Sequence, residues 1–494
     1  MADELGSRDM ILYDYSGHVR TYTYGEVFSL CKRYLAFWGA NGLKCGDTVA
    51  VVLPNAPETI IAFFSAILAG IHFAPLPCTV TGREMRNWTS LVHPKLILKK
   101  DGLDDLDTSE IPTVSLQCDG SFAWLPEQEG VVEKADAHIY LYTSGSTGAP
   151  KAMQISADRL WSSGKAFVAF YGIENKKLRF WNYLPMSYLG GLYNLALIPM
   201  SCGGSFVISE PFSGKTVLNY WGFVRKHAIN ALWLVPSIVR GLLKLRKLIG
   251  GSEKKSKRSD IEIAFLGTAP IQLDEKREFE EVFGIRLYEN FALSESTFLT
   301  AESERNIRFR EQGSVGEVLP YADIKLDPIL GAENLGTIWL KTPFLFDGYL
   351  SENGALELET DDEGYFNSKD LGYFNDDHVL VLCGRSRDII KKGGLFVSLT
   401  EVENAVMKID SVEEAAGLAV AHDFYGEDYV LCVKFKNGAD ECEETKKLRM
   451  WMIESFVPYK RAEKIICRTD FPRTASGKLK KEELRKELIR EGLL

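Results

Sequence analysis

Hydroxyl groups, glycines and one lysine are concentrated in the ten residues from Tyr142 to Lys151, YTSGSTGAPK. Glycines let backbone N–H groups turn toward an anion, serine and threonine hydroxyls add donors, and lysine supplies the opposite charge. The segment therefore has the chemistry of a phosphate-binding loop. It is not a Walker loop, in which lysine directly follows a glycine, because Lys151 follows Gly148 by three residues. A generic turn rich in serine and glycine is the alternative interpretation.

Five later segments carry further glycines and charged residues at ordered positions. Together with residues 142–151 they resemble the motifs of the adenylate-forming superfamily, which contains acyl-CoA and aryl-CoA synthetases, acyl-AMP ligases and the adenylation domains of peptide synthetases. The resemblance follows the family's order and extends from about residue 20 to about residue 485. The segments are Gly267-Thr-Ala-Pro270, Asn290-Phe-Ala-Leu-Ser-Glu295, Tyr365-Phe-Asn-Ser-Lys-Asp370, Gly384-Arg-Ser-Arg-Asp-Ile-Ile-Lys-Lys-Gly-Gly394 and Pro472-Arg-Thr-Ala-Ser-Gly-Lys478.

The resemblance implies an enzyme, an AMP-forming acid–thiol ligase. A carboxylic acid and ATP would give acyl-AMP and pyrophosphate, and the acyl group would then pass to a thiol. Both partners of the first step are anions, so positioning and charge neutralisation must supply most of the catalysis. The implied cofactors are ATP, Mg²⁺ and CoA, or the phosphopantetheine of a carrier protein in place of CoA. A non-catalytic nucleotide-binding paralogue and a luciferase-like oxidase are the alternatives.

The resemblance also assigns roles to single residues. Lys151 matches the lysine of the loop that holds the β- and γ-phosphates, and Glu295 matches the carboxylate that binds Mg²⁺. Asp370 and Arg385 match the groups that hold the ribose hydroxyls. Lys478 matches the catalytic lysine between the acyl carboxylate and the α-phosphate, for which a lysine in a surface turn is the alternative. The other nucleotide-binding residues implied are Thr143, Ser144, Gly145, Ser146, Thr147, Gly148, Gly267, Thr268, Ala269, Pro270, Asn290, Phe291, Ala292 and Ser294.

A change in composition toward lysine and glutamate begins after Gly384. By resemblance, residues 387–494 form a mobile C-terminal domain that carries the catalytic lysine, Arg387 is its hinge, and residues 1–386 form the AMP-binding and acyl-substrate domain. Gly394 matches a glycine that leaves room for the pantetheine thiol, which predicts a CoA tunnel. A glycine required by a turn of positive φ is the alternative. The match favours CoA as acceptor and leaves a carrier protein open.

The nature of the acid is predicted from the residues around Tyr188. Amino-acid-activating relatives hold the substrate ammonium with an aspartate here, and residues 184–190, LPMSYLG, contain none. A buried ammonium without a counter-charge is costly. We therefore expect a small carboxylic acid that is apolar or aromatic and has no α-amino group. A purely structural role in the core is the alternative for the predicted lining, which consists of Tyr188, Gly191, Trp233, Gly267, Phe291 and Ala292.

Three positions depart from the family's pattern. Phe291-Ala292 replaces an aromatic–glycine pair, Tyr188 stands where many acyl-CoA ligases have histidine, and Lys369 replaces the glycine that commonly precedes the ribose-binding aspartate. The charged residues of the motifs are all retained, so activity is still predicted.

The elements that must position these motifs follow from hydrophobic patterning. Apolar β-branched runs alternate with helical stretches, which predicts an α/β protein with a large N-terminal domain of layered mixed sheets and flanking helices, and a small α+β C-terminal domain. A chain of 494 residues exceeds what one core usually organises. The pattern predicts strands at 48–53, 231–235, 261–266, 414–420 and 429–435, and helices at 24–37, 217–227, 274–283 and 400–409.

Composition excludes several classes of function. A net charge of −10 argues against a nucleic-acid-binding protein, which needs a basic face. Nine cysteines without a C-x-x-C pair predict a reducing compartment and no zinc site. The acidic N-terminus differs from a signal peptide, so we expect a cytoplasmic protein. The apolar run at 59–77 is interrupted by Gly70, Pro75 and Pro77, which predicts buried core and no membrane span.

The segment at 244–258 is strongly basic in an otherwise acidic chain. A solvated loop is one interpretation. A contact site for an acidic partner, such as the phosphates of CoA or a carrier protein, is the other.

Overall fold

The computed structural model describes residues 5–15, 17–104, 106, 110–132, 136–144, 150–210, 214–248, 260–267, 271–329, 335–351, 354–385, 388–392, 395–436, 438–473 and 479–494. The chain divides into two compact units. The first unit comprises Met1–Ser303, Leu319–Ala322 and Thr342–Glu359, and the second comprises Glu304–Val318, Asp323–Lys341 and Thr360–Leu494.

The largest sheet of the first unit joins a parallel half to an antiparallel half. The strand β3 (Thr48–Val52) is buried along its whole length, because a parallel strand with helices on both faces exposes neither side. The described strands of this sheet lie in the order β19 (Leu356–Glu357), β18 (Gly348–Leu350), β8 (Pro150–Ser156), β7 (His138–Ser144), β4 (His72–Pro75), β3, β5 (Leu96–Lys100) and β6 (Thr113–Leu116).

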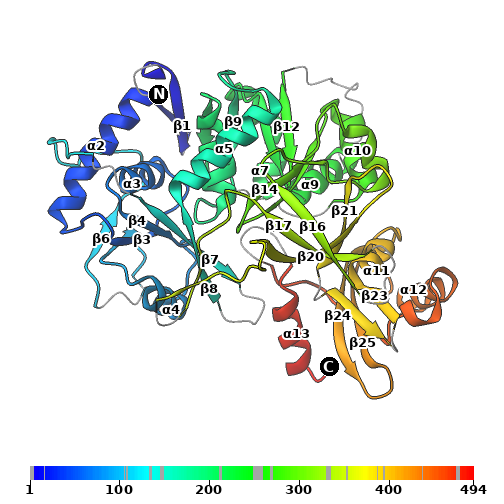
Figure 1. Cartoon of the computed structure of the whole chain (residues 1–494). Coiled ribbons are helices and arrows are strands. Elements are labelled where there is room, and N and C mark those ends of the chain that lie inside the picture. The colour runs from blue at the N-terminus through cyan, green and yellow to red at the C-terminus, as the bar shows by residue number, and fades with distance from the viewer. Residues whose placement is uncertain are drawn as a thin grey trace. The chain divides into compact units, whose positions relative to one another are not determined.

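Helices α3 (Pro57–Leu68) and α4 (Gly82–Val92) cover opposite faces of this sheet (Figure 1). The ring of Phe63 in α3 contacts that of Phe73 in β4, with centroids 5.2 Å apart, whereas Trp88 in α4 packs in one cluster with Ala74. Neighbouring residues of a strand point to opposite faces, which accounts for the arrangement. The apolar run at 59–77 therefore forms a core helix and a core strand, as predicted. No helix among the described residues combines the length and apolarity needed to cross a bilayer.

Two further sheets complete the first unit. One has the order β2 (His18–Thr23), β1 (Asp9–Tyr15), β10 (Ser205–Ile208), β9 (Arg179–Asn182). The other contains the parallel strands β11 (Ala231–Leu234), β12 (Ile263–Leu266) and β13 (Tyr288–Leu293), followed by β14 (Thr297–Ala301) antiparallel to β13. The remaining described helices of this unit are α2 (Tyr24–Ala40), α5 (Ala157–Tyr171), the π-helical segment Gly190–Leu197, α6 (Ile198–Ser201), α7 (Gly214–Leu218), α8 (Tyr220–Lys226), α9 (Pro236–Leu248) and α10 (Leu273–Phe283).

The helix predicted at 217–227 is wrong at its start. Asn219 separates α7 from α8 with φ −110° and ψ 16° and makes no side-chain capping bond, and asparagine has a low preference for a helix interior. The end of the helix predicted at 274–283 is correct, because α10 also ends at Phe283. Gly284 adopts the left-handed φ of 67° that ends this helix, as glycine permits.

The second unit contains two sheets. An antiparallel sheet has the order β16 (Asp323–Pro328), β17 (Gly336–Lys341), β20 (Phe366–Phe374), β21 (Leu380–Arg385). The other has the order β23 (Leu395–Ser398), β22 (Ile389–Lys392), β25 (Gly426–Phe435), β24 (Val412–His422), and β26 (Lys464–Cys467) pairs in parallel with β25. The remaining described elements are a 3₁₀ turn at Ile307–Gln312, β15 (Glu317–Val318), α11 (Leu399–Val406), α12 (Glu441–Ser455), a 3₁₀ turn at Pro458–Lys460 and α13 (Lys481–Arg490).

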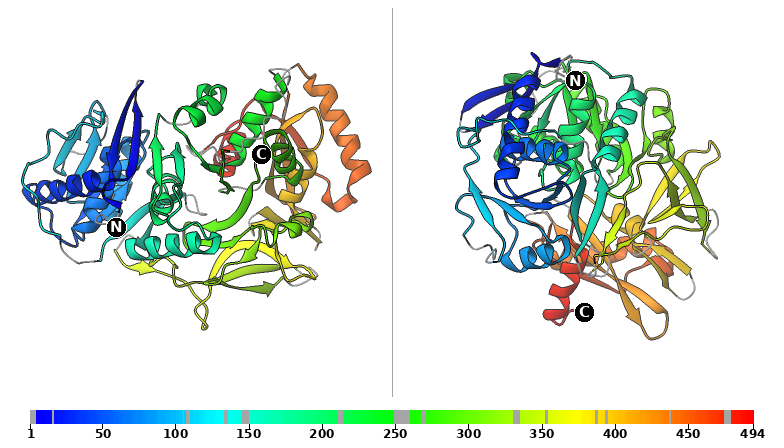
Figure 2. Two further views of the ribbon diagram at one scale, coloured as in Figure 1. Left: turned by 90° about the horizontal axis from the view of Figure 1, so that it is seen from above. Right: turned by 60° about the vertical axis from the view of Figure 1, so that its left-hand side comes forward.

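Strands β24 and β25 form a long twisted hairpin, and helices cover both of its faces (Figures 1 and 2). Leu431 in β25 packs with Val402 of α11 and Leu448 of α12. Its neighbour Cys432 packs with Leu484 of α13. The alternation of the strand therefore separates two small cores. The predicted α/β class, with an α+β arrangement of the C-terminal residues, is confirmed.

Candidate active site

The predicted phosphate-binding loop connects β7 to β8. The two strands are antiparallel, and their register pairs Thr143 with Lys151 and Ser144 with Pro150. The intervening residues, which include Gly145, Ser146, Thr147 and Gly148, lie outside the described residues. Burial raises the pKa of Tyr142, on β7, to about 12, so this phenol is neutral at physiological pH. The hairpin thus places Lys151 at the point where the chain leaves the loop.

The predicted Mg²⁺ carboxylate lies at the tip of the β13–β14 hairpin. Leu293 pairs with Thr297, so Ser294, Glu295 and Ser296 form the turn. Thr297 has a φ of 59°, which is strained for a β-branched residue. Backbone strain of this kind clusters at functional sites, where the surrounding structure enforces it.

A buried charge cluster holds the base of the same hairpin. The ammonium of Lys276 in α10 lies 2.5 Å from Glu302 Oε2 and 3.1 Å from Glu289 Oε2. The backbone N–H of Glu289 donates to Glu302 Oε2 at 2.8 Å. Lys276 and Glu302 are both about 1% exposed, and a buried charge requires such partners. These contacts connect both arms of the hairpin that carries Glu295 to α10.

Glu295 and Lys151 both contact Tyr349 of β18. The Tyr349 hydroxyl donates to Glu295 Oε1 at 2.5 Å. The ammonium of Lys151 lies 5.0 Å from the centroid of the Tyr349 ring, within the range of a cation–π contact. The backbone N–H of Phe346 also donates to the carbonyl oxygen of Glu295 at 2.7 Å. A carboxylate and an ammonium from separate motifs are thus gathered at one tyrosine.

Gly267 directly follows β12, and Asn290 lies within the neighbouring parallel strand β13. A Cβ at Gly267 would come within 2.8 Å of Asn290 Oδ1, so a larger residue here would displace the Asn290 side chain. The Asn290 amide donates to the carbonyl of Leu266 at 3.2 Å. The carboxyl ends of parallel strands are where open α/β sheets bind ligands. The rest of this motif, Thr268, Ala269 and Pro270, lies outside the described residues.

The residues predicted to line the acyl pocket differ in their surroundings. Trp233 is buried in an aromatic cluster, with ring centroids 4.9 Å from Phe265 and 5.4 Å from Phe298. A Cβ at Gly191 would come within 2.5 Å of the carbonyl oxygens of residues 184 and 185, so close backbone packing explains this glycine. Phe291 is buried, Tyr188 is half-buried, and Ala292 is exposed. Their contact with a substrate remains a prediction.

Asn55 is a residue near this region that the sequence did not point to. Its amide donates to the carbonyl of Leu184 at 2.7 Å, and its Oδ1 accepts the backbone N–H of Met186 at 3.0 Å. The two bonds fix the segment that leads to Tyr188. A side chain 129 residues away from Leu184 can be linked to it only in the folded chain.

Asp370 and Arg385, the predicted ribose pair, lie together in the second unit. They face each other across β20 and β21, and the Arg385 Nε–H donates to Asp370 Oδ1 at 3.0 Å. The Asp370 side chain is 10% exposed and that of Arg385 is 49% exposed. The Ser368 hydroxyl accepts the backbone N–H of Asp370 at 3.0 Å. A shielded carboxylate beside an accessible guanidinium can recognise neighbouring hydroxyl groups.

The catalytic-lysine motif is described only at its flanks, because Lys478 lies outside the described residues. Arg473 and Leu479 form a β-bridge that closes the loop, and Arg473 pairs with Glu414 of β24. Lys481, at the start of α13, lies 2.7 Å from both Asp388 Oδ1 and Glu403 Oε1. Burial raises the pKa of Glu403. The base of the loop is therefore tied to β24 and α11.

The predicted hinge residue Arg387 and the predicted tunnel residue Gly394 also lie outside the described residues. Asp388 follows the hinge position directly, and the ion pair with Lys481 connects it to α13. The two strands that flank residue 394, β22 and β23, are antiparallel neighbours.

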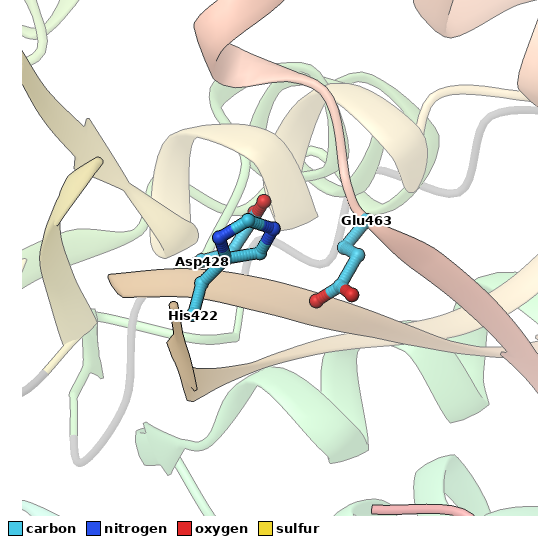
Figure 3. A group of neighbouring side chains, drawn as sticks. All are labelled: His422, Asp428 and Glu463. Atoms are coloured by element: carbon cyan, nitrogen blue, oxygen red, sulfur yellow. The ribbon is translucent and has the colours of Figure 1, made fainter. Parts of the chain in front are cut away.

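Figure 3 shows a cluster of His422, Asp428 and Glu463 in the second unit, whose ligand atoms lie within 4.8 Å of one another. The Lys392 ammonium already lies 2.6 Å from Asp428 Oδ2 and 2.7 Å from Asp428 Oδ1. The His422 Nδ1 accepts the backbone N–H of Phe424 at 3.1 Å. The Lys392 ammonium therefore already supplies a positive charge next to Asp428. We interpret the cluster as a set of contacts that stabilises the β24–β25 turn.

Two family models match the chain. A model described as AMP-binding enzyme matches residues 4–350, and one described as AMP-binding enzyme C-terminal domain matches residues 401–478. Among curated proteins, the chain is 26% identical over 464 residues to an oxalate–CoA ligase of Arabidopsis thaliana, covering 89% of this chain and 88% of the relative. It is 24% identical over 504 residues to 4-coumarate–CoA ligase 1 of Narcissus pseudonarcissus, with coverage of 96% and 90%.

Solved structures have the same fold over almost the whole chain. ATP-bound MatB from Rhodopseudomonas palustris superposes with a TM-score of 0.85 at 24% identity, covering 98% of this chain and 96% of that one. The o-succinylbenzoate CoA synthetase of Bacillus subtilis, solved with its acyl-adenylate intermediate, gives a TM-score of 0.82 at 22% identity, with coverage of 98% and 96%.

Proposed function

Because the chain belongs to the AMP-binding enzyme family, we propose that it is an ATP-dependent ligase that joins a carboxylic acid to the thiol of CoA. In the first step a carboxylate oxygen bonds to the α-phosphorus while the bond to pyrophosphate breaks. In the second step the sulfur bonds to the acyl carbon, AMP leaves with the electron pair of the acyl C–O bond, and the thiol loses its proton. The observation that carries the proposal is the meeting of Lys151 and Glu295 at Tyr349.

We assign Lys151 and the loop at 143–148 to the β- and γ-phosphates, and Glu295 to Mg²⁺. The donor set fits this ion, which takes one or two protein carboxylates together with phosphate oxygens. Glu295 is half-buried at the tip of its turn, and one of its two oxygens accepts from Tyr349. When bound, Mg²⁺ would neutralise charge on the phosphates and polarise them. Lysine adds a mobile positive charge to the same anion.

We assign Asp370 and Arg385 to the ribose hydroxyls and Lys478 to the developing charge between the carboxylate and the α-phosphate. The carboxylate of Asp370 would accept from the hydroxyls, and the guanidinium of Arg385 would donate to them. The support for this assignment is the cross-strand contact between these two residues. The adenine would lie near Gly267 to Pro270 and Asn290 to Ala292, beyond the end of β12 and along β13.

For the acid we propose an apolar or aromatic carboxylate without an α-amino group. Residues 184–190 provide no carboxylate for an ammonium, and Trp233, one of the predicted lining residues, lies in a cluster of aromatic rings with Phe265 and Phe298. The relatives named above act on acids as different as oxalate and 4-coumarate, so the acid itself has to be found by experiment.

The acceptor thiol has two candidates. We propose CoA, with Gly394 leaving space for the pantetheine, because the curated relatives named above are CoA ligases. Transfer to a carrier protein is the second candidate, for which the basic segment at 244–258 would be the contact site; residues 249–258 of this segment lie outside the described residues. We also infer a cytoplasmic location, because all nine cysteines are free, as in a reducing compartment.

A screen of carboxylic acids for acid-dependent release of pyrophosphate from ATP tests the proposal. At least one apolar or aromatic acid should give release that requires Mg²⁺, and addition of CoA should give a product with the mass of the CoA thioester. A thioester with an added carrier protein in place of CoA would support the second acceptor. ATP binding without release for any acid would support the non-catalytic paralogue instead, and acid-dependent light emission would reveal an oxidase.

A further inference from the structure

Tyr349 contacts two oppositely charged residues of the first unit, Glu295 and Lys151. Glu295 is assigned to Mg²⁺, and Lys151 is assigned to the phosphates of ATP. The Tyr349 hydroxyl donates to Glu295 Oε1 at 2.5 Å, and its ring lies 5.0 Å from the ammonium of Lys151. We propose that Tyr349 is a positioning residue that holds Glu295 for the metal and Lys151 for the phosphates. This inference rests on the proposed function.

The hydroxyl of Tyr349 restricts the Glu295 carboxylate. A glutamate at the tip of a turn has three rotatable bonds, and their freedom is lost when the side chain binds a metal. A hydrogen bond to a charged group is among the stronger ones in proteins. The bond engages Oε1, which leaves Oε2 to face an ion. Such outer-shell bonds orient metal ligands and tune their affinity.

The main chain of Glu295 is held by the same segment. The Phe346 N–H donates to its carbonyl oxygen at 2.7 Å, so residues 346–349 contact Glu295 at both the backbone and the carboxylate. The turn and its side chain are therefore oriented together.

The segment that carries Tyr349 is itself strongly constrained. Asp347 Oδ1 accepts from Arg159 Nη1 at 2.6 Å, and Asp347 Oδ2 accepts from Gln154 Nε2 at 3.3 Å. Gly348 has a φ of 142°, and a Cβ there would come within 2.8 Å of the Glu357 carbonyl oxygen. A residue placed by so many contacts can act as a fixed support for mobile side chains.

The ring of Tyr349 has a separate task. Tyr349 pairs with Met153 on β8, the strand that also carries Lys151. The negative face of an aromatic ring attracts a cation within about 6 Å of its centroid. The Tyr349 ring therefore holds the Lys151 ammonium on the β18 side of β8. This position is already set when no ATP is bound. Tyr349→Phe should keep the ring contact with Lys151 and lose the hydrogen bond to Glu295.

Calorimetric titration separates the two tasks, with ATP plus Mg²⁺ or ATP plus EDTA as ligands and no acid present. Tyr349→Phe should weaken binding of ATP·Mg²⁺ by about 10-fold or more, the usual cost of losing an outer-shell partner of a metal ligand. It should leave binding of metal-free ATP unchanged. Tyr349→Leu should weaken binding of both ligands, because it also removes the ring that faces Lys151.

A matched control is Tyr24→Phe, which removes a buried hydroxyl that donates to the Gly204 carbonyl at 2.7 Å and has no part in the site. Tyr24→Phe should bind both ligands as the wild type does. Its unfolding temperature should be comparable to that of Tyr349→Phe, because each variant loses one tyrosine hydroxyl. Unchanged ATP·Mg²⁺ affinity in Tyr349→Phe would overturn the inference, as would a wild type to which Mg²⁺ adds no affinity. A wild type that binds ATP·Mg²⁺ but activates no acid would overturn only the proposed function.

Discussion

Lys369 shows how one residue can conflict with the backbone that it occupies. It has a φ of 61°, in the left-handed region that costs an ordinary L-residue about 1–2 kcal/mol. The family commonly has glycine at this position, directly before the ribose-binding aspartate, and the observed φ explains that preference. The strain is compensated by Asn367, whose Oδ1 accepts the Lys369 N–H at 2.8 Å.

Lys369→Gly should therefore raise the free energy of unfolding by about 0.5–1 kcal/mol, since relief of the strain exceeds the entropy that glycine adds to the unfolded chain. Urea denaturation measures the change. Lys369→Ala is the control and should bring no gain, because alanine keeps its Cβ. A loss of stability in the glycine variant would mean that the lysine side chain makes a contact more valuable than the strain.

Lys478, the proposed catalytic lysine, gives a second prediction at this scale. Lys478→Ala should slow acyl-AMP formation by about two to four orders of magnitude, because a positive charge aimed at the reacting anions is lost. Thioester formation from supplied acyl-AMP should fall much less. Lys480→Ala, a lysine of the same segment outside the motif, is the control. An equal loss in both half-reactions would indicate a structural role for Lys478.

At the scale of elements, a buried carboxyl connects α3 to the loop around Gly120. Glu58 is fully buried, and its Oε1 accepts the Gly120 N–H at 2.7 Å. Burial, helped by the negative charge of Asp119, raises the pKa of Glu58 to about 7 from an ordinary value of 4.5. The folded chain thus retains a proton between pH 4.5 and pH 7 that the unfolded chain releases.

Stability should consequently fall as pH rises through this window, because the folded state binds the additional proton. Glu58→Gln carries no titratable proton and should exceed the wild type in free energy of unfolding by about 1–3 kcal/mol at pH 8, and by much less at pH 5. Urea denaturation at both pH values measures this difference. Glu129→Gln, on the surface, should show no such dependence. A constant difference between Glu58→Gln and wild type would refute the shifted pKa.

At the scale of the whole molecule, the two proposed half-reactions make different demands on the residues after the proposed hinge. Lys478 is assigned to the first step and Gly394 to the second, and both belong to the segment at 387–494. One arrangement of this segment cannot present both to the same reacting group, so a rotation at Arg387 between the steps is proposed. The boundary between residues 386 and 387 is a prediction about this motion.

Arg387→Pro should restrict the rotation, because proline fixes its own φ and limits the residue before it. Acyl-AMP formation should persist while thioester formation slows. Separate assays of pyrophosphate release and of thioester formation from supplied acyl-AMP measure the two steps. Arg387→Lys, which keeps a flexible backbone, should perform both, and unchanged thioester turnover in the proline variant would contradict the rotation.

Motifs and elements that depend on neighbours in the chain were predictable from the amino-acid sequence. Asp370 and Arg385 are 15 residues apart on strands joined by a short connection, so local pairing brings them together. The strand around 48–53 and the break in the apolar run at 59–77 follow from periodicity and from prolines. The start of α8 was mistaken because the helical pattern continues across Asn219, where the backbone leaves the helical conformation.

Only the tertiary structure decided the contacts that join distant segments. Tyr349 reaches Glu295 across 54 residues, and Asn55 reaches Leu184 across 129. Neither residue type nor spacing indicates such a pairing. A tyrosine in a strand, or an asparagine that follows a strand, can form hydrogen bonds with many different partners. The sequence by itself indicates which groups are candidates for binding ATP, since the chemistry of each motif is local. Their positions depend on how the sheets bring β8, β13 and β18 together, because those contacts are set by packing over the whole unit.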